Sequence, residues 1–295
     1  MSMGLTKYLV RAELTNRNML FWGVGYMLLW IIMGAFLFTK GFPKLPQPYM
    51  DEAVRLYTGD WTALIIAYEP SGVLIGLLFM LVYQTAGMAY LRRYGRLTPT
   101  KFITSYYLGM VISSLVLSLL LVASTIAIFY VGFRYYLGFD IPLSAVLPKD
   151  PVLGIAKVIG LSLLTFLFMG SLLFLLGVAS LNASLRQVYR ISMIPMIIVF
   201  ISYFMYLYLK LPNWAILLNP FMGIMGTIAT VYMGLNHMPS RLVVTTSGNY
   251  MEISKAIPLT YGIASIIIWT VVFTALAIPL ITRVRYRPPE EIREF

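Results

Sequence analysis

The chain has 295 residues, of which 60% are hydrophobic and only 11% are charged. Soluble domains carry charge on about a quarter of their residues, so the composition excludes an ordinary soluble protein. It predicts an all-α integral membrane protein with one transmembrane domain over residues 1–295. The net charge of +11 fits basic loops at anionic lipid better than it fits nucleic acid. With no Cys and one His, disulfides, thiolate catalysis and a Cys- or His-based metal site are excluded.

The segment 1–19 is predicted to be an amphipathic helix at the membrane interface. Apolar residues recur in it at helical spacing, and cations lie on another face. The apolar residues are Leu5, Tyr8, Leu9 and Ala12, and the cations are Lys7, Arg11 and Arg17. The alternative, the charged start of a secretory signal, is weaker because the apolar run that follows is long enough to span a bilayer.

Six apolar runs have the length and composition of transmembrane helices, each about 20 residues or more. The predicted spans are 20–38, 71–91, 100–133, 158–185, 191–209 and 257–282. Between the first two, residues 39–70 carry Pro43, Pro46 and Pro48 together with four acids, which indicates an extracytoplasmic loop or cap. Gly72 and Gly76 are spaced for close approach of another helix.

The stretch 214–235 is apolar enough for a seventh span, but it contains Asn219-Pro220. Proline disfavours helix at the preceding residue and starts a new helix well. The remaining run, 221–235, then rises only about 22 Å, which is too short to cross a bilayer. A broken, re-entrant helical hairpin is therefore predicted here, with Asn219 and Pro220 at its break.

The charge distribution favours six spans over seven. With six spans both termini, the 90–102 connection and the connection after the fourth span share one side, and the tail 283–295 lies there too. That side holds most of the cations and few acids, as the positive-inside rule requires of a cytoplasmic face. Its cations are Lys7, Arg11, Arg17, Arg92, Arg93, Arg96, Lys101, Arg186, Arg190, Arg283, Arg285, Arg287 and Arg293.

None of the six predicted spans contains Asp, Glu, Lys, Arg or His in its interior. Ion-coupled carriers and intramembrane enzymes place ionisable groups at depth, because they bind or move charge there. A self-powered carrier and an enzyme are therefore disfavoured. No phosphate-binding loop of the type Gly-x-x-x-x-Gly-Lys-Ser/Thr occurs, so this chain binds no nucleotide cofactor of its own.

The densest cationic cluster lies in 90–102, which reads Tyr-Leu-Arg-Arg-Tyr-Gly-Arg-Leu-Thr-Pro-Thr-Lys-Phe. A helical turn would place Arg92, Arg93 and Arg96 on one cationic face. Thr98 is a natural N-cap and Pro99 a natural first helical residue for the third span. Taken alone, the stretch is equally consistent with a passive topological anchor and with a surface that another protein binds.

An interfacial N-terminal helix, six spans, this basic connection and a broken hairpin before the last span together resemble the permease subunits of type-two ABC exporters. The resemblance covers nearly the whole chain. It implies a permease that pairs with a second copy, identical or different, and docks separate ABC ATPase subunits, which carry ATP and magnesium. It also implies that the 90–102 connection is a coupling helix joined at the ATPase by the interfacial helix. The coupling residues are then Arg92, Arg93, Tyr94, Gly95, Arg96, Leu97, Thr98, Pro99 and Lys101.

The sequence therefore predicts the membrane subunit of an ATP-driven exporter in a prokaryotic plasma membrane, with both termini in the cytoplasm and no enzymatic activity of its own. Uncharged spans rich in Met and aromatic residues suit a hydrophobic or amphipathic substrate such as a lipid, peptide or drug. The alternative is a membrane scaffold or sensor that transports nothing and binds a cytoplasmic partner through the same basic loop.

Overall fold

The computed structural model of the chain describes residues 3–42, 44–46, 49–93, 98–179, 185–209, 211–242 and 257–282, although the side chains of 73–93 and some others lie outside the description. The described residues are almost entirely helical. The α-helices are α1 (Met3–Thr15), α2 (Arg17–Leu20), α3 (Tyr26–Ile32), α4 (Tyr49–Arg93), α5 (Pro99–Val131), α6 (Pro151–Ala179), α7 (Leu185–Tyr208), α8 (Asn213–Leu218), α9 (Pro220–Tyr232) and α10 (Leu259–Thr282).

Shorter turns complete the helical segments. Three π-helical turns are η1 (Phe21–Gly25), η2 (Met33–Leu37) and η4 (Gly132–Tyr136), and two 3₁₀ turns are η3 (Phe38–Gly41) and η5 (Leu143–Ala145). Strands β1 (His237–Met238) and β2 (Ile257–Pro258) form one short antiparallel pair ahead of α10.

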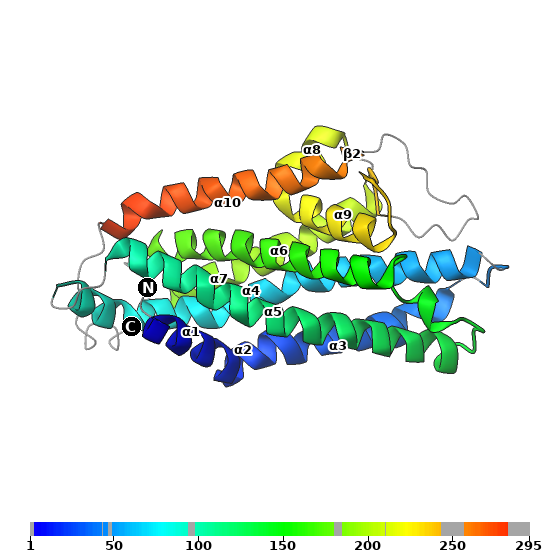
Figure 1. Cartoon of the computed structure of the whole chain (residues 1–295), viewed down its shortest axis with the longest axis horizontal. Helices are drawn as coiled ribbons and strands as arrows, with labels where there is room; N and C mark the ends of the chain where they lie inside the picture. The colour runs from blue at the N-terminus through cyan, green and yellow to red at the C-terminus, as the bar shows by residue number, and fades with distance from the viewer. Residues whose placement is uncertain are drawn as a thin grey trace.

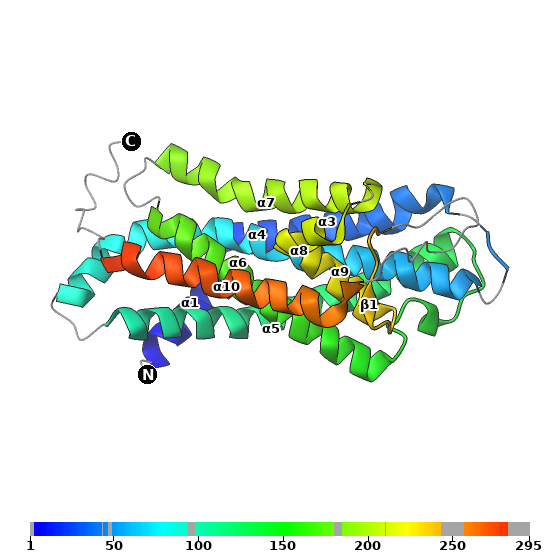
Figure 2. The ribbon, with the colours of Figure 1, turned by 90° about the horizontal axis from the view of Figure 1, so that it is seen from above.

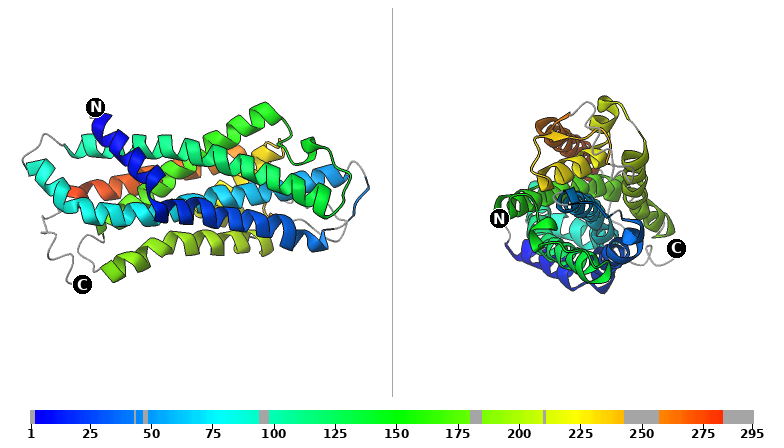
Figure 3. Two further views of the ribbon diagram at one scale, coloured as in Figure 1. Left: turned by 90° about the horizontal axis from the view of Figure 1, so that it is seen from below. Right: turned by 90° about the vertical axis from the view of Figure 1, so that its right-hand side faces the viewer.

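The long helices form an elongated bundle with two distinct ends (Figures 1 and 2). The last residues of α4, α6 and α10 and the first residues of α5 and α7 lie at one end, which we call the α4–α5 end. The end of η3 and the starts of α4, α6 and α10 lie at the other, which we call the outer end. Helix α1 crosses the bundle obliquely towards the α4–α5 end (Figure 3). The helix ends that border the 90–102 connection, the connection after the fourth predicted span and the tail 283–295 therefore all lie at the α4–α5 end. These three segments were predicted to share one side of the membrane.

Five helical stretches in the described part of the chain are long and apolar enough to cross a bilayer, which makes the chain a multi-pass membrane protein. They are Phe21–Gly41, Tyr107–Tyr136, Pro151–Ala179, Arg190–Tyr208 and Leu259–Leu280. Each overlaps a predicted span. The predicted second span, 71–91, lies within α4, where most side chains are outside the description, so the count of six stays a prediction.

Helix α4 corrects the predicted loop over 39–70. The chain is helical from Tyr49 and continues without interruption through Pro70 to Arg93. Asp51 and Glu52 lie in the first helical turn, where carboxylates favour helix formation. The prolines at 43, 46 and 48 delimit the true connection, whereas Pro70 is tolerated inside α4. At about 1.5 Å per residue, α4 rises about 68 Å, more than twice the thickness of the hydrocarbon core.

Helix α4 is also the central helix of the bundle, because it packs against α3, α5, α6, α7 and α9. At the outer end, aromatic rings bind it to its neighbours. The Trp61 ring stacks on Phe38 at 5.8 Å between centroids, and Tyr57 lies 5.7 Å from Phe129 of α5. Such ring pairs contribute about 0.5–1.5 kcal/mol each beyond area burial.

The predicted break before the last span is present. Helix α8 ends at Leu218, Asn219 has extended backbone (φ −95°, ψ 100°), and α9 begins at Pro220. Helix α9 has 13 residues, a rise of about 20 Å, so it is too short to cross a bilayer. Every residue of α9 is buried, which explains the apolar composition of this segment.

Candidate functional site

The predicted coupling element is only partly described. Residues 94–97 lie outside the described part, and Arg92 and Arg93 belong to α4 with side chains that are not described. The predicted helix start is confirmed: the Thr98 side chain accepts a hydrogen bond from the Lys101 backbone N–H at 3.3 Å, and Pro99 opens α5. Thr98 and Lys101 are exposed. The role of the element in coupling remains a prediction.

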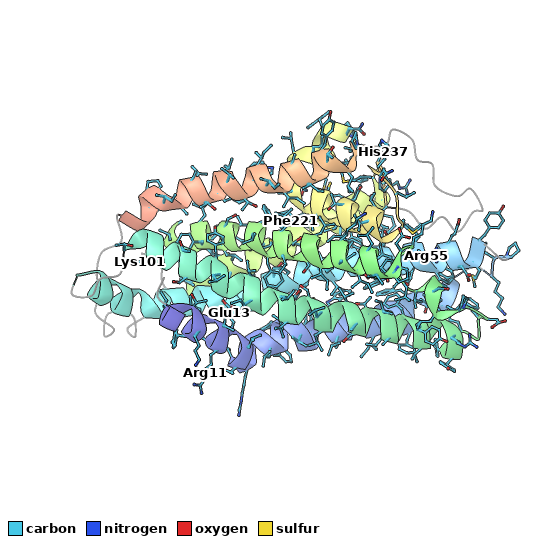
Figure 4. All side chains as sticks on the ribbon, viewed as in Figure 1. Arg11, Glu13, Arg55, Lys101, Phe221 and His237 are labelled. Carbon is cyan, nitrogen blue, oxygen red and sulfur yellow. The ribbon has the colours of Figure 1, made fainter. Side chains whose placement is uncertain are left out.

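Helix α1 packs along α5 near the same end. The Leu9 side chain is buried against Gly109, where an added Cβ would lie 3.2 Å from the Leu9 Cβ. Lys7, Arg11 and Arg17 are exposed, and Figure 4 shows Arg11 pointing away from the bundle. The three cations of the predicted interfacial helix are therefore available to lipid headgroups or to a partner.

The buried face of α1 differs from the predicted one. Tyr8 is 53% exposed, whereas Thr6 and Glu13 are buried. Burial raises the pKa of Glu13 from 4.5 to about 7, although the nearby Ser113 hydroxyl of α5 offsets part of this effect. Glu13 thus changes charge near neutral pH, at the contact between α1 and α5. The burial of Glu13 could not be predicted from the sequence, because a single Glu on an amphipathic helix is ordinarily solvated.

Two acids lie inside the bundle, in the part of the chain that was predicted to be an extracytoplasmic loop or cap and outside the six predicted spans. Asp60 is 3% exposed and Glu69 is fully buried. Both belong to α4, in the part expected to be a loop. Their depth follows from the contact between α4 and the first span: Trp61 packs on Gly34, and Gly72 lies against the backbone of Trp22. Asp60 and Glu69 therefore lie at the level of the span Phe21–Gly41.

Neither carboxyl group is satisfied by the described residues. All four carboxylate oxygens are buried without a hydrogen-bond partner in the described part of the chain. Nine residues turn an α-helix about two and a half times and advance it about 14 Å, so Asp60 and Glu69 face opposite sides of α4. They form two separate polar positions and not one carboxylate pair.

Asp60 lies at the contact between α4 and α7, within electrostatic range of the Tyr203 and Tyr206 phenols. The preceding Gly59 packs against the Tyr232 ring of α9, 3.1 Å from where its Cβ would lie. The Tyr206 hydroxyl donates to the Pro239 carbonyl at 2.6 Å instead of to Asp60. Three helices thus converge at Asp60 without giving it a hydrogen bond.

The nearest cation along α4 does not compensate the acid either. The Arg55 guanidinium donates to the carbonyls of Leu147 at 3.1 Å and Ser144 at 2.9 Å. It thereby links the start of α4 to the connection between α5 and α6, at the outer end (Figure 4). Arg55 is used for tertiary structure and is not the counter-ion of Asp60.

The helix break at Asn219 is held from two directions. The side-chain oxygen Oδ1 of Asn219 accepts hydrogen bonds from the Phe221 and Met222 backbone N–H groups, at 3.0 and 3.4 Å. Its amide donates to the Ser202 hydroxyl of α7 at 2.9 Å. The Ser265 hydroxyl of α10 donates to the Leu217 carbonyl at 2.5 Å. The break is therefore a defined junction between α7, α9 and α10.

Metal binding finds no support in the described residues, which contain no group of three or more His, Cys, Asp or Glu side chains that could hold an ion. Next to Asp60 and Glu69 lies a narrow apolar depression between α3, α4 and α7. It is lined by Met27, Trp30, Leu64, Ile65, Tyr68 and Phe200. Neither acid lines this depression.

The sequence matches no model of a protein family and no curated protein. The candidate site therefore depends on geometry alone: the capped start of α5 with the α1 contact at the α4–α5 end, and the two acids in the bundle interior.

Proposed function

We propose that this chain is the membrane subunit of an ATP-driven exporter of the ABC type, paired with a second permease copy and docked on separate ATPase subunits. The observation that carries the proposal is the geometry at the α4–α5 end. The two longest helices, α4 and α5, meet there across only a few residues, and α5 starts at a capped, proline-fixed position. A force applied to the basic connection is transmitted to both helices.

The length of these helices supports this role, in which α4 and α5 act as a lever that carries movement from the basic connection into the bundle. Helix α4 rises about 68 Å and α5 about 50 Å, so both reach from the α4–α5 end through the bundle. Helix α1 lies along α5 with Leu9 against Gly109, and its cations are exposed. In the proposed orientation the α4–α5 end is cytoplasmic, which places the basic residues according to the positive-inside rule. The α8–α9 hairpin then re-enters the membrane from the outer side.

The proposed substrate is hydrophobic or amphipathic. Helix α10 is largely exposed along its length, with residues such as Ile268 and Val271 about 60% exposed. An apolar helix face of this kind is covered by lipid or by a second permease copy. A lipid, peptide or drug that partitions into the bilayer reaches such a face sideways, without crossing water.

The test uses the permease co-purified with an ATPase subunit from its native membrane and reconstituted in vesicles. Substituting Arg92, Arg93 and Arg96 together by Ala should abolish ATPase association and the ATP-dependent movement of a fluorescent lipid. The matched control substitutes Lys40, Lys44 and Lys157, three exposed cations at the outer end, and should leave both unchanged. Association with a partner that hydrolyses no nucleotide would instead favour the scaffold or sensor.

The two buried acids favour a second candidate, a proton-coupled carrier. An ionisable residue inside a membrane bundle commonly marks a proton or substrate pathway, and Asp60 and Glu69 remove the argument that this chain lacks such groups. In the same vesicles, transport driven by a pH gradient with no ATPase present would replace the exporter proposal with this one. Transport that requires ATP and tolerates a collapsed gradient supports the exporter.

A further inference from the structure

Asp60 and Glu69 pose a specific energetic problem. A carboxylate inside the hydrocarbon core of a bilayer is strongly disfavoured unless its charge is neutralised. Both side chains are at least 97% buried, and none of their oxygens has a donor among the described residues. Each group must therefore be neutralised by a bound cation or by a proton.

Protein cations do not neutralise them in the described part of the chain. Arg55 is occupied by two carbonyl groups, and Lys157 of α6 and Arg190 of α7 are exposed. Arg134 lies 3.8 Å from Asp140 and forms an ion pair with it.

The other titratable groups around Asp60 are phenols. Tyr57 of α4 and Tyr203 of α7 contribute no hydrogen bond to it, and Tyr57 donates to the Gly34 carbonyl at 3.1 Å. Tyr206 donates to Pro239, and Tyr232 of α9 to the Val146 carbonyl. Around Glu69, the phenols of Tyr26 and Tyr68 belong to the aromatic contact between α3 and α4.

A metal ion or an organic cation would need both ligands and space. No cluster of three metal-ligating side chains occurs among the described residues. The depression beside α4 is apolar and too narrow for a water molecule. Gly59 is in contact with the Tyr232 ring and Gly72 with the Trp22 backbone. The packing at these two positions leaves no space for an ion beside α4. A proton is the one cation that needs no additional volume.

We propose that Asp60 and Glu69 are two separate proton-binding positions on α4, both occupied in this closed arrangement, and that Asp60 releases its proton when the contact between α4 and α7 opens. Opening admits water, which stabilises the carboxylate, so proton release and helix separation favour each other. The site thereby links the conformation of the lever helix to pH. This inference does not depend on the exporter proposal, because it concerns the chain itself, with or without an ATPase.

The first test detects the protons directly. The purified chain, carrying Glu13→Gln to remove that group's contribution, is placed in phosphatidylcholine vesicles at pH 7 and examined by infrared spectroscopy. Protonated carboxylic acids have a carbonyl stretching band that carboxylates lack. We expect the band to lose one component in Asp60→Asn and the other in Glu69→Gln, and to remain unchanged in Asp150→Asn, whose side chain is exposed.

Isotope labelling keeps this test valid if a substituted chain fails to fold. Carbon-13 in the side-chain carboxyl of Asp should shift the Asp60 component, and the same label in Glu should shift the Glu69 component, with Asp60 and Glu69 themselves unaltered. Absence of the band at pH 7, or a band that neither label shifts, would overturn the proposal.

The second test measures the release of the proton on opening. Because the chain has no native Cys, Val199→Cys places a single thiol on α7, one turn before Tyr203. Its maleimide reactivity is divided by that of Lys44→Cys, an exposed reference position. The ratio should rise severalfold between pH 6 and pH 9 with Asp60 present and stay constant with Asp60→Asn. A ratio that is constant in both, or that rises equally in both, contradicts proton-linked opening.

Discussion

Polar groups have opposite environments at the α4–α5 end and in the interior stretch of α4 from Gly59 to Gly72. At the end, Thr98 satisfies the start of α5 through its own side chain, and Lys101 is exposed to solvent. In the interior, Asp60, Glu69 and Ser71 have buried oxygens with no partner among the described residues. The end is built from local interactions, and the interior from packing that overrides the preferences of individual residues.

This difference separates two kinds of function. Exposed cations around a capped helix can bind and release a partner at little cost to folding, because surface charge pairs contribute about 0–1 kcal/mol. Unpartnered acids in a packed core are expensive in the charged state, so they persist only with protons or where conformational change relieves them. The end is suited to receive a force, and the interior to respond to one.

The largest expected effect comes from overpacking the interior. In Gly72→Ala the new Cβ would lie 2.7 Å from the Trp22 carbonyl oxygen, a backbone atom that cannot rotate away. Overpacking of this kind costs about 1–3 kcal/mol, and we expect the upper part of that range. The measurement is the thermal unfolding midpoint in detergent, followed by tryptophan fluorescence.

Gly160→Ala is the matched control for this substitution. It is also in a helix, but no atom lies within 4 Å of its added Cβ, so the higher helix propensity of Ala should stabilise it by about 0.5–1 kcal/mol. Equal midpoints for the two variants would show that α4 does not pack as closely against the first span as the structure has it.

Glu13 allows a test of how a buried acid near the α4–α5 end affects stability as the pH changes. Its pKa is raised from 4.5 to about 7 by burial, so the native chain holds a proton there that the unfolded chain loses at lower pH. The stabilisation from the neutral group is complete below pH 4.5 and is lost as the pH rises through 7. We expect α1 docking to weaken by about 3 kcal/mol between these limits.

Hydrogen exchange of the α1 amides, corrected for the intrinsic effect of pH, measures this loss. Glu13→Gln stays neutral and should keep α1 equally protected at pH 5 and pH 8. The prediction fails if the wild-type chain also shows no difference, or if α5 residues far from Ser113 respond as strongly as α1 does.

The comparison also explains what the sequence could reveal. Helices with uninterrupted apolar runs were predicted close to their observed positions, and so were the Thr98 cap and the Asn219 break, because these depend on residues adjacent in the chain. The interior was missed: Asp60, Glu69 and Pro70 are all typical of a loop, and their burial depends on α3, α7 and α9. The apolar run 61–68 indicated the buried helix, because it lies between Asp60 and Glu69 and shortly precedes the predicted second span. Together the two segments have the length of one continuous helix.

At the helix break, Asn219→Ala removes the cap of α9 and the hydrogen bond to Ser202. Loss of an N-cap costs about 0.5–2 kcal/mol, and the unpaired Ser202 hydroxyl, which is 2% exposed, adds to it. We expect about 2 kcal/mol in total, measured as a lower unfolding midpoint. Asn219→Ser keeps an acceptor for the α9 N–H groups and should recover about half of the loss. If Ser and Ala behave alike, the cap does not hold the break.

The smallest effect is expected at the exposed end. Thr98→Ala removes a cap that accepts a single hydrogen bond at 3.3 Å, from the Lys101 N–H. The cost should be about 1 kcal/mol and should appear as faster hydrogen exchange in the first turn of α5. Thr98→Ser keeps the hydroxyl and should exchange like the wild type. Because the cap fixes where α5 begins, the Ala variant should also reduce any ATPase stimulation more than its small effect on stability implies. A proportional reduction would mean that the start of α5 serves folding only, and the lever would have to be sought in another connection of the bundle.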